Sequence, residues 1–319
     1  MISKKQIFVP VMGISCNSNC IMCSVSAKKK DNNSGTTQQI IDGLINSHEN
    51  GYQRVDFTGG EPTARKDINI LIKKAKELGY RDIGISTNGI LLSDKEFLDK
   101  LIKSGLNTIT FALHAHSPKL HKLISRTPTA FTKEIKAIKY ATKYNNLIVA
   151  AATVILRQNH KYLFKLGNFI HSLGIHYWNI TDLIPYGRGQ TNYNNLFISR
   201  IQLSKTLSSI KPLLSKFNSI SLFAMTPCVI PRDILYDKNI LLFTTKQKID
   251  LLEDIFYKRL DDNENHKKNY LPQKQLPICQ QCKFRLQCDG VWIKYLRLKG
   301  STVNTEIFRL AKKFNYLIK

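Results

Sequence analysis

The sequence has no long apolar run. None approaches the roughly 20 residues that a helix needs to cross a bilayer, and the N-terminal MISKKQIFVP lacks an apolar segment followed by a small-residue cleavage site. We therefore expect no membrane span and a cytoplasmic location.

Acidic residues are also few. Only 23 Asp and Glu stand against 48 Lys and Arg, which gives a net charge of +25. Such a field attracts nucleic acid, acidic peptides or acidic redox proteins. The lysines are spread over most of the predicted helices, however, so an evenly solvated basic surface also explains the charge. Because no added RNA-binding fold is recognisable, nucleic acid is not the expected partner.

The seven cysteines are clustered and odd in number. Disulfides rarely persist in a reducing compartment, and a disulfide framework would leave one cysteine unpaired. The cysteines are better interpreted as metal or redox ligands.

Short β-rich runs alternate with longer stretches of helical period. Strands are predicted at 7–14, 54–57, 82–86, 108–113, 147–156 and 177–184. Helices are predicted at about 36–49, 66–78, 93–104, 130–144, 159–173 and 199–217. Six βα units in register imply a parallel sheet. Periodicity alone does not decide whether that sheet curls toward a barrel or stays open and doubly wound.

The unusual motifs all follow predicted strands. CNSNCIMC (16–23), TGGEP (58–62), STNG (86–89) and HAH (114–116) come after strands one to four. In parallel α/β folds the chemistry lies at the carboxyl ends of the strands. We therefore expect these four motifs to share one rim of the sheet.

The first motif carries three cysteines within eight residues. Thiolates from one loop suit a cubane iron–sulfur cluster. The spacing departs from four-ligand ferredoxin runs and from zinc fingers, which pair their ligands two and two. The fourth corner of the metal site is left without a protein ligand.

Cys16-x-x-x-Cys20-x-x-Cys23 after the first strand, GGEP after the second, and six βα units resemble the radical S-adenosylmethionine (radical SAM) superfamily over about residues 5–225. The resemblance implies an α/β fold with a partial (β/α)6 TIM-type barrel at 1–218. It also implies that the three cysteines bind a [4Fe–4S] cluster whose fourth iron takes S-adenosylmethionine. Reductive cleavage would then yield methionine and a 5′-deoxyadenosyl radical that abstracts hydrogen from substrate.

The resemblance also implies residues that bind this cofactor. Gly59, Gly60 and Glu61 match the family's GGE motif, which contacts the methionine amino group. Glycines allow close backbone approach, and a carboxylate can pair with an ammonium. Ser86 and Asn88 lie where related proteins contact the ribose or the carboxylate, although TNG is equally a good turn sequence.

Two further regions are similar in position to cofactor-lining residues of relatives. Thr153 and Arg157 correspond to positions near the cofactor carboxylate, and IPYGRG (184–189) corresponds to the loop near adenine. His114 and His116 face the same rim, where they either touch substrate and shuttle protons or make ordinary hydrogen bonds. No catalytic residue is assigned.

The other four cysteines follow the βα pattern, in residues 219–319. Cys279-x-x-Cys282-x5-Cys288, with Cys228 upstream, resembles the SPASM and twitch extensions of radical SAM enzymes. A further cysteine of the full SPASM pattern is replaced within 289–292. We therefore expect one auxiliary [4Fe–4S] cluster in a small irregular module that ends in a basic amphipathic helix. Structural zinc and unligated thiols are the alternatives, and without Cys228 one iron would be open to substrate.

The resemblance favours a maturase that modifies a peptide or protein, in particular a ribosomally made peptide. No N-terminal winged helix precedes the first strand, so we expect a separate leader-recognition protein, and flavodoxin or ferredoxin as reductant. The alternative is biosynthesis of a small cofactor. RNA modification and a non-catalytic iron–sulfur protein rank below both.

Overall fold

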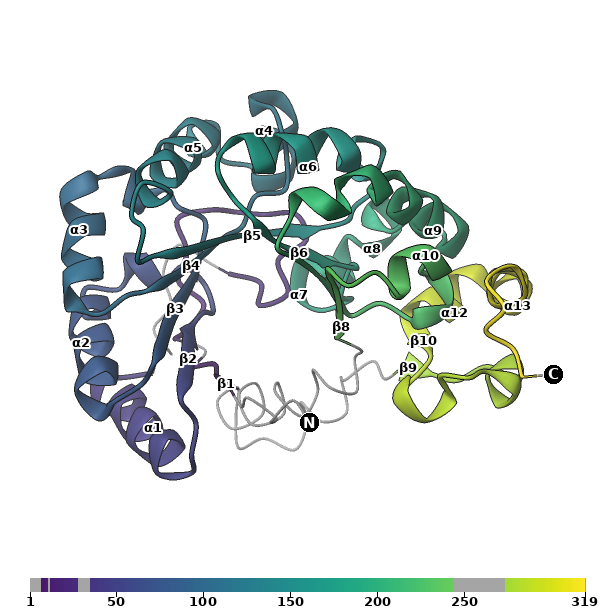
Figure 1. The fold of residues 1–319 in the computed structure, drawn as a ribbon, viewed down its shortest axis with the longest axis horizontal. Coiled ribbons are helices and arrows are strands. Elements are labelled where there is room, and N and C mark those ends of the chain that lie inside the picture. The colour runs from purple at the N-terminus through teal and green to yellow at the C-terminus, as the bar shows by residue number, and fades with distance from the viewer. Residues whose placement is uncertain (1–6, 11, 28–34, 244–272, 319) are drawn as a thin grey trace.

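The computed structural model describes residues 7–10, 12–27, 35–243 and 273–318 (Figure 1). A single sheet of eight parallel strands dominates it, and the strands lie in the order of the sequence. They are β1 (Ile7–Phe8), β2 (Arg54–Phe57), β3 (Asp82–Thr87), β4 (Thr108–Phe111), β5 (Ile148–Val154), β6 (Tyr177–Thr181), β7 (Ser219–Phe223) and β8 (Ile240–Phe243).

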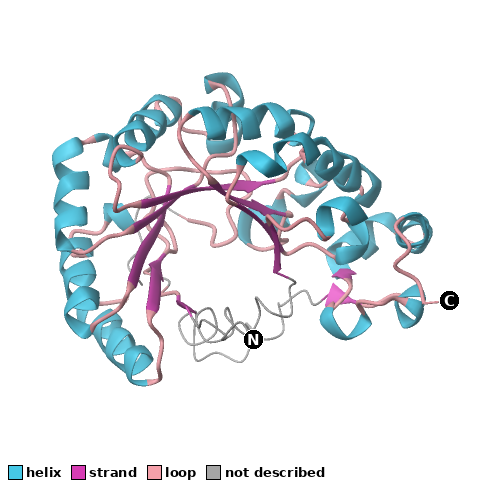
Figure 2. Cartoon of the chain, in the orientation of Figure 1, coloured by secondary structure: helices cyan, strands magenta, loops and turns pink. Residues whose placement is uncertain are grey.

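The sheet is an open arc with helices along its outer side (Figure 2). The main helices are α1 (Thr37–Glu49), α2 (Ile68–Leu78), α3 (Lys95–Ser104), α4 (Pro118–Ser125), α5 (Ala130–Ala141), α6 (Leu163–Ser172) and α9 (Arg200–Ser209), and the shorter α7 (Gly187–Thr191) and α8 (Tyr193–Leu196) follow β6. Local signals set the helix ends: Thr36 forms a capping box with Gln39, and Gly79 ends α2 in the left-handed conformation.

The predicted α/β partial barrel is confirmed, and each of the six predicted strands is present. The first is shorter than the predicted run 7–14. Beyond β1, Met12 donates its backbone N–H to Thr58, and Gly60 and Glu61 donate theirs to Gly13 and Ser15. The cysteine-bearing chain therefore stays beside the GGE motif without forming a regular ladder.

The sheet also continues past residue 218, where the sequence predicted an irregular module. β7 begins at Ser219 and pairs with β6, and β8 pairs with β7. Only the 3-10 turn η5 (Pro227–Val229) and the four-residue α10 (Arg232–Leu235) join these two strands. Because no amphipathic helix lies between β7 and β8, the sequence does not show the alternating strand–helix pattern there. The predicted helix 199–217 is likewise divided, since α9 ends at Ser209 and the proline-containing 3-10 helix η4 (Lys211–Lys216) follows.

The C-terminal part packs at the end of the arc (Figure 1). It comprises an antiparallel pair, β9 (Gln273–Lys274) and β10 (Val291–Trp292), the 3-10 helices η8 (Pro277–Gln281) and η9 (Arg285–Gln287), and α12 (Ile293–Lys299) and α13 (Thr302–Lys313). The predicted amphipathic C-terminal helix corresponds to α13, which buries Val303, Ile307 and Leu310. Tyr316 donates its hydroxyl to the Ile230 carbonyl at 3.0 Å and so ties this part to the segment after β7.

A continuous apolar core lies between the sheet and its helices. Phe57, Phe111 and Trp178 are fully buried on β2, β4 and β6. No described helix combines the length and apolar character needed to cross a bilayer.

Candidate active site

Cys16, Cys20 and Cys23 lie on the loop between β1 and α1, at the carboxyl end of the sheet. Backbone bonds hold this loop against the end of α4. Asn19 donates its N–H to the Ser125 carbonyl at 3.1 Å, and Ile21 donates to Ile124 at 2.9 Å. The loop thus spans from the first strand toward the fourth βα unit.

The three sulfurs have hydrogen-bond donors around them. Cys16 Sγ accepts from the Ser18 N–H at 3.3 Å, and Cys23 Sγ accepts from the Ala27 N–H at 3.3 Å. Cys20 Sγ lies 3.4 Å from the Ser18 hydroxyl. Donors at sulfur stabilise thiolates and help to set the potential of iron–sulfur clusters. Three soft donors on one loop therefore fit such a cluster.

Without a cation the thiols of Cys16 and Cys20 are protonated. Burial raises the pKa of Cys16 to about 12 and raises the pKa of Cys20. A metal ion reverses this preference because it coordinates the thiolate directly. Loading the loop with iron would therefore release protons, so we expect loading to improve as the pH rises.

The glycines of TGGEP allow the loop after β2 to lie against the cysteine-bearing segment. A Cβ at Gly60 would lie 2.0 Å from the Ser15 carbonyl oxygen. Gly59 has a φ of 124°, which disfavours other residues. Gly60 therefore requires glycine for a contact within the protein itself, and Gly59 requires it for its backbone conformation.

Glu61 is buried and joins the loops after β2 and β3. Its carboxylate accepts from the hydroxyls of Thr63 and Thr87, both at 2.6 Å, and from the N–H groups of Thr63 (3.1 Å) and Asn88 (2.8 Å). Burial raises its pKa, and these donors oppose the rise. The structure thus gives Glu61 a positioning role, whereas the contact between GGE and a methionine amino group stays a prediction.

Ser86 and Asn88 behave differently from each other. Ser86 donates its hydroxyl to Asp56 at 2.7 Å, and burial raises the pKa of that carboxyl to about 6. Asn88 Nδ2 donates to Asn17 Oδ1 at 2.7 Å and lies 3.8 Å from Cys16 Sγ. Asn88 therefore joins the cysteine site, through a contact that the sequence did not predict.

The side chains of Thr153 and Arg157 are held by contacts within the protein. The Thr153 side chain is fully buried, donates to the Leu113 carbonyl at 2.7 Å and accepts from the Trp178 indole at 2.9 Å. Arg157 donates to the carbonyls of Asn194 and Phe197. Thr153 is thus a core residue and Arg157 fastens the loop around α8, and their predicted contacts with the cofactor stay predictions.

The two rim histidines also differ. His114 is buried and accepts at Nδ1 from the Val154 N–H at 3.2 Å, and burial lowers its pKa to about 3. His116 packs its ring against Tyr162 at 5.3 Å, and its buried Nδ1 has no hydrogen-bond partner among the described residues. His114 is therefore a neutral structural group.

The sequence did not suggest the buried pair formed by His121 and Glu134, on α4 and α5. His121 Nδ1 lies 3.5 Å from Glu134 Oε2, and Glu134 is fully buried. Burial raises the pKa of Glu134 and lowers that of His121 to about 4. A charged residue in a Lys-rich helical sequence is normally interpreted as solvated, so no sequence signal marked this pair.

The remaining four cysteines line one cavity. Cys228 comes from η5, and Cys279, Cys282 and Cys288 come from the stretch between β9 and β10. Leu276 donates its N–H to Cys279 Sγ and Gly290 donates to Cys288 Sγ, both at 3.3 Å. Burial raises the pKa of Cys228 to about 12. The fold thus brings Cys228 to the three cysteines that follow it by about fifty residues.

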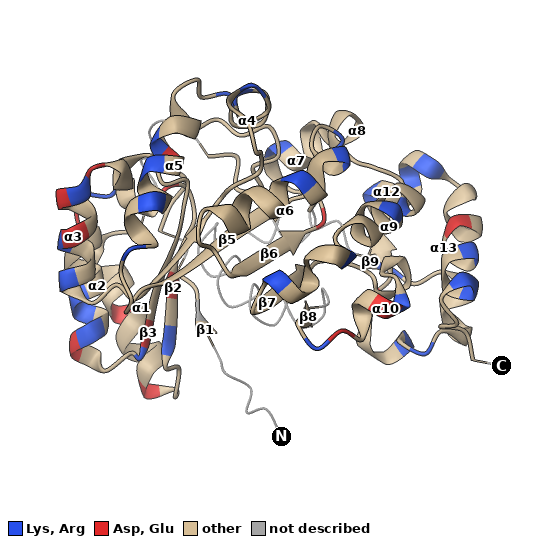
Figure 3. Cartoon of the chain, turned by 45° about the horizontal axis from the view of Figure 1, so that its top comes forward, with Lys and Arg blue, Asp and Glu red and all other residues tan. Residues whose placement is uncertain are grey.

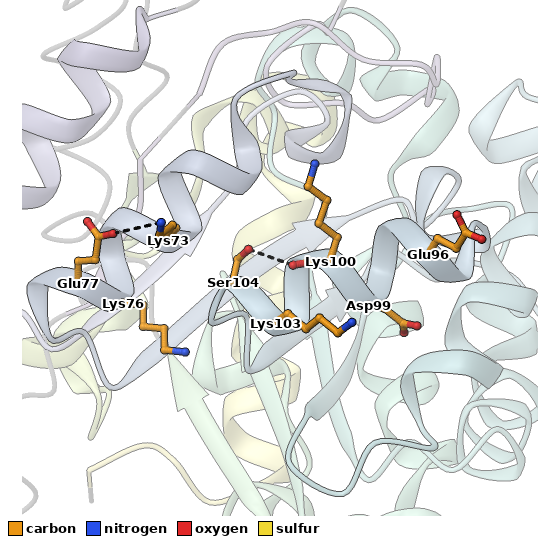
Figure 4. A pocket seen from close by; sticks show the side chains of 8 residues that line it. All are labelled: Lys73, Lys76, Glu77, Glu96, Asp99, Lys100, Lys103 and Ser104. Atoms are coloured by element: carbon orange, nitrogen blue, oxygen red, sulfur yellow. Dashed lines mark hydrogen bonds and ion pairs between the residues drawn. The ribbon is translucent and has the colours of Figure 1, made fainter.

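A separate groove lies on the outer face of α2 and α3 (Figure 4). It is lined by Lys73, Lys76, Glu77, Glu96, Asp99, Lys100, Lys103 and Ser104. Both signs of charge occur there, and no predicted site residue lines it. Figure 3 shows basic residues on many outer helices, which agrees with a broadly solvated basic surface.

The Radical SAM superfamily model matches residues 11–170. The chain belongs to the radical SAM superfamily. It is therefore an enzyme of the class that uses S-adenosylmethionine and a [4Fe–4S] cluster. The three-cysteine loop, GGEP and β2 to β5 all lie within the matched residues.

Curated relatives of this radical SAM protein include probable GTP 3′,8-cyclases. That of Saccharolobus islandicus is 33% identical over 175 residues, which cover 55% of this chain and 56% of the relative. That of Sulfolobus acidocaldarius is 30% identical over 188 residues and 59% of each protein. The match thus spans little more than half the length of these relatives.

Solved radical SAM structures share the fold over most of the chain. Streptococcus suis SuiB bound to its precursor peptide SuiA has a TM-score of 0.64 at 18% identity, covering 93% of this chain and 73% of SuiB. Native anSMEcpe with bound AdoMet (S-adenosylmethionine) has a TM-score of 0.58 at 15% identity, covering 96% of this chain and 97% of that one. At these identities the likeness concerns the fold alone.

Proposed function

We propose that this chain holds a [4Fe–4S] cluster on Cys16, Cys20 and Cys23 and uses it to cleave S-adenosylmethionine reductively. The observation that carries the proposal is the arrangement of three thiols on one loop at the carboxyl end of the sheet, with backbone N–H donors at Cys16 and Cys23 and the Ser18 hydroxyl beside Cys20. When bound, the cluster supplies the electron that breaks the sulfonium.

The chain's own residues shape that site. Glu61 ties the loops after β2 and β3 together, and Asn88 links the latter to Cys16 and Asn17. Gly60 lets the polypeptide pass close to the cysteine segment, and Gly59 supplies the positive φ of the turn before it. The result is a preorganised rim on which the nucleotide would be oriented and shielded from water.

We further infer one auxiliary [4Fe–4S] cluster held by Cys228, Cys279, Cys282 and Cys288. Support comes from their common cavity, its apolar walls and the N–H donors at two sulfurs. Metal analysis of anaerobically reconstituted protein distinguishes the alternatives. Two clusters require about 8 irons per chain, whereas zinc or free thiols in the C-terminal part leave about 4.

For the substrate we propose a small anionic molecule of cofactor biosynthesis, with a purine nucleoside triphosphate as the first to test. The probable GTP 3′,8-cyclases support this class by sequence, and the net charge of +25 suits a polyphosphate. The peptide substrate that the sequence favoured, with its separate leader-recognition protein, has support only from the fold of enzymes such as SuiB. A flavodoxin or ferredoxin would supply the electron.

Anaerobic assays with dithionite test both the cleavage of S-adenosylmethionine and the proposed substrate class. Wild-type protein should release 5′-deoxyadenosine and methionine, and Cys20→Ala should abolish this cleavage. Cys282→Ala is the matched control, because it should spare cleavage while product from a true substrate is lost. Cleavage stimulated by GTP, with a changed nucleotide detected by mass spectrometry, supports the small-molecule class. No release by iron-loaded wild type would refute the proposal.

A further inference from the structure

Arg188 fastens the segment after β6 to the cysteine loop through three hydrogen bonds. Arg188, in α7, donates its backbone N–H to the Cys23 carbonyl at 2.8 Å. Its Nε donates to the Cys20 carbonyl at 2.8 Å, and its Nη1 donates to the Ala27 carbonyl at 2.6 Å. One residue therefore binds three carbonyls of the loop that carries the thiols.

Residues next to Arg188 also contact the cysteine loop closely. Asn192 donates from Nδ2 to the Ile21 carbonyl at 2.9 Å. A Cβ at Gly187 would lie 2.4 Å from the Ser24 carbonyl oxygen, and one at Gly189 would lie 3.2 Å from that of Met22. Glycines on both sides of Arg188 thus let α7 lie directly on residues 20–27. The expected place of this segment near adenine stays a prediction.

The guanidinium of Arg188 also brings charge to the site. Its Nη2 is buried without a hydrogen-bond partner, and within the described residues no carboxylate pairs with it. An uncompensated cation beside partly buried thiols stabilises negative charge there more strongly than it would in water.

We propose that Arg188 is a positioning residue that holds the cysteine loop in its cluster-binding shape, and that its charge favours the reduced state of the cluster. The charge effect on the cluster rests on the proposed function, whereas the positioning role does not. Reduction adds one negative charge to a centre already bound by three thiolates. The nearby guanidinium should therefore shift the reduction potential of this cluster upward.

Hydrogen–deuterium exchange on the metal-free protein tests the first half. Arg188→Gln should speed exchange of amides in residues 19–27 by about tenfold, because the three anchoring bonds are lost or weakened. Arg54→Gln, which removes an ion pair with Asp82 from the start of β2, should leave these amides unchanged. Exchange in β3 and β4 reports global unfolding in the same samples. If the amides of residues 19–27 in Arg188→Gln exchanged as slowly as in the wild type, the proposed positioning role of Arg188 would be overturned.

Redox titration of the reconstituted proteins tests the second half, monitored by the paramagnetic signal that changes when S-adenosylmethionine is added. Arg188→Gln should lower the potential of that signal. Arg188→Lys should restore it toward the wild-type value while leaving exchange fast, because lysine keeps the charge but not the three-way geometry. Equal potentials in all three proteins would overturn the charge effect. If wild-type protein bound no cluster, the proposed function would fail. The exchange result would still decide whether Arg188 positions the cysteine loop.

Discussion

Asn88 and Cys16 are brought together from loops 72 residues apart, with Asn88 Nδ2 lying 3.8 Å from the Cys16 sulfur and 2.7 Å from Asn17 Oδ1. This contact joins the loop after β3 to the cysteine loop. The side-chain amide of Asn88 is held in this orientation because its Oδ1 accepts a hydrogen bond from the Ile90 N–H at 3.0 Å.

Replacing Asn88 by Ala should therefore weaken the site without unfolding the protein. We expect S-adenosylmethionine cleavage to fall by about tenfold, the equivalent of one or two hydrogen bonds. Rates of 5′-deoxyadenosine release measure this. Asn168→Ala, on the exposed face of α6, is the control. An unchanged rate in Asn88→Ala would show that the contact has no part in positioning.

Gly60→Ala should be among the most damaging small substitutions. Its Cβ would meet the Ser15 carbonyl at 2.0 Å, so the GGE loop and the cysteine segment must separate. We expect a loss of about 3 kcal/mol in the free energy of unfolding and poor iron loading. Gly51→Ala has open space around it and should cost about 1 kcal/mol through its positive φ alone. Denaturant titration and iron analysis compare the two, and equal losses would contradict the steric argument.

A buried ion pair should anchor the C-terminal part. Arg200 Nη1 lies 2.5 Å from Asp182 Oδ2, and its guanidinium stacks 4.6 Å from the centre of the Tyr295 ring of α12. Asp182→Asn leaves the buried guanidinium unpaired, so we expect a loss of about 3 kcal/mol. The exposed pair of Lys211 and Asp233 supplies the control, since Asp233→Asn should cost less than about 1 kcal/mol. Thermal or denaturant unfolding provides the measurement.

Stability should decline in acid partly through His114. Burial lowers its pKa from 6.5 to about 3, so the folded state keeps it neutral while the unfolded state binds a proton. Its contribution is complete above pH 6.5 and is lost as the pH falls toward 3, by up to about 1.4 kcal/mol per pH unit. His114→Gln should flatten the dependence of unfolding free energy on pH between 6.5 and 4. A wild-type slope in His114→Gln would refute this assignment.

Much of the site could be predicted from the positions of the motifs along the sequence. Cys16, Cys20 and Cys23 follow the first strand, and GGEP and STNG follow the next two, so the parallel order of β1 to β3 alone predicts that they meet. The missed strands β7 and β8 lack an intervening amphipathic helix, and for that reason the sheet seemed to end at residue 218. The contacts of Thr153 with Leu113 and Trp178 were not predicted, because a strand's alternation does not reveal which groups bond a buried hydroxyl.

The sequence by itself determined the family, the alternation of strands and helices, and the loop that carries three thiols, because these depend on residue types at short, fixed spacings. Only the tertiary structure decided which donors surround each sulfur, that Glu61 joins two loops, and that Arg188 reaches back 168 residues to the Cys20 carbonyl. Such contacts depend on how distant segments pack, and no local period encodes them.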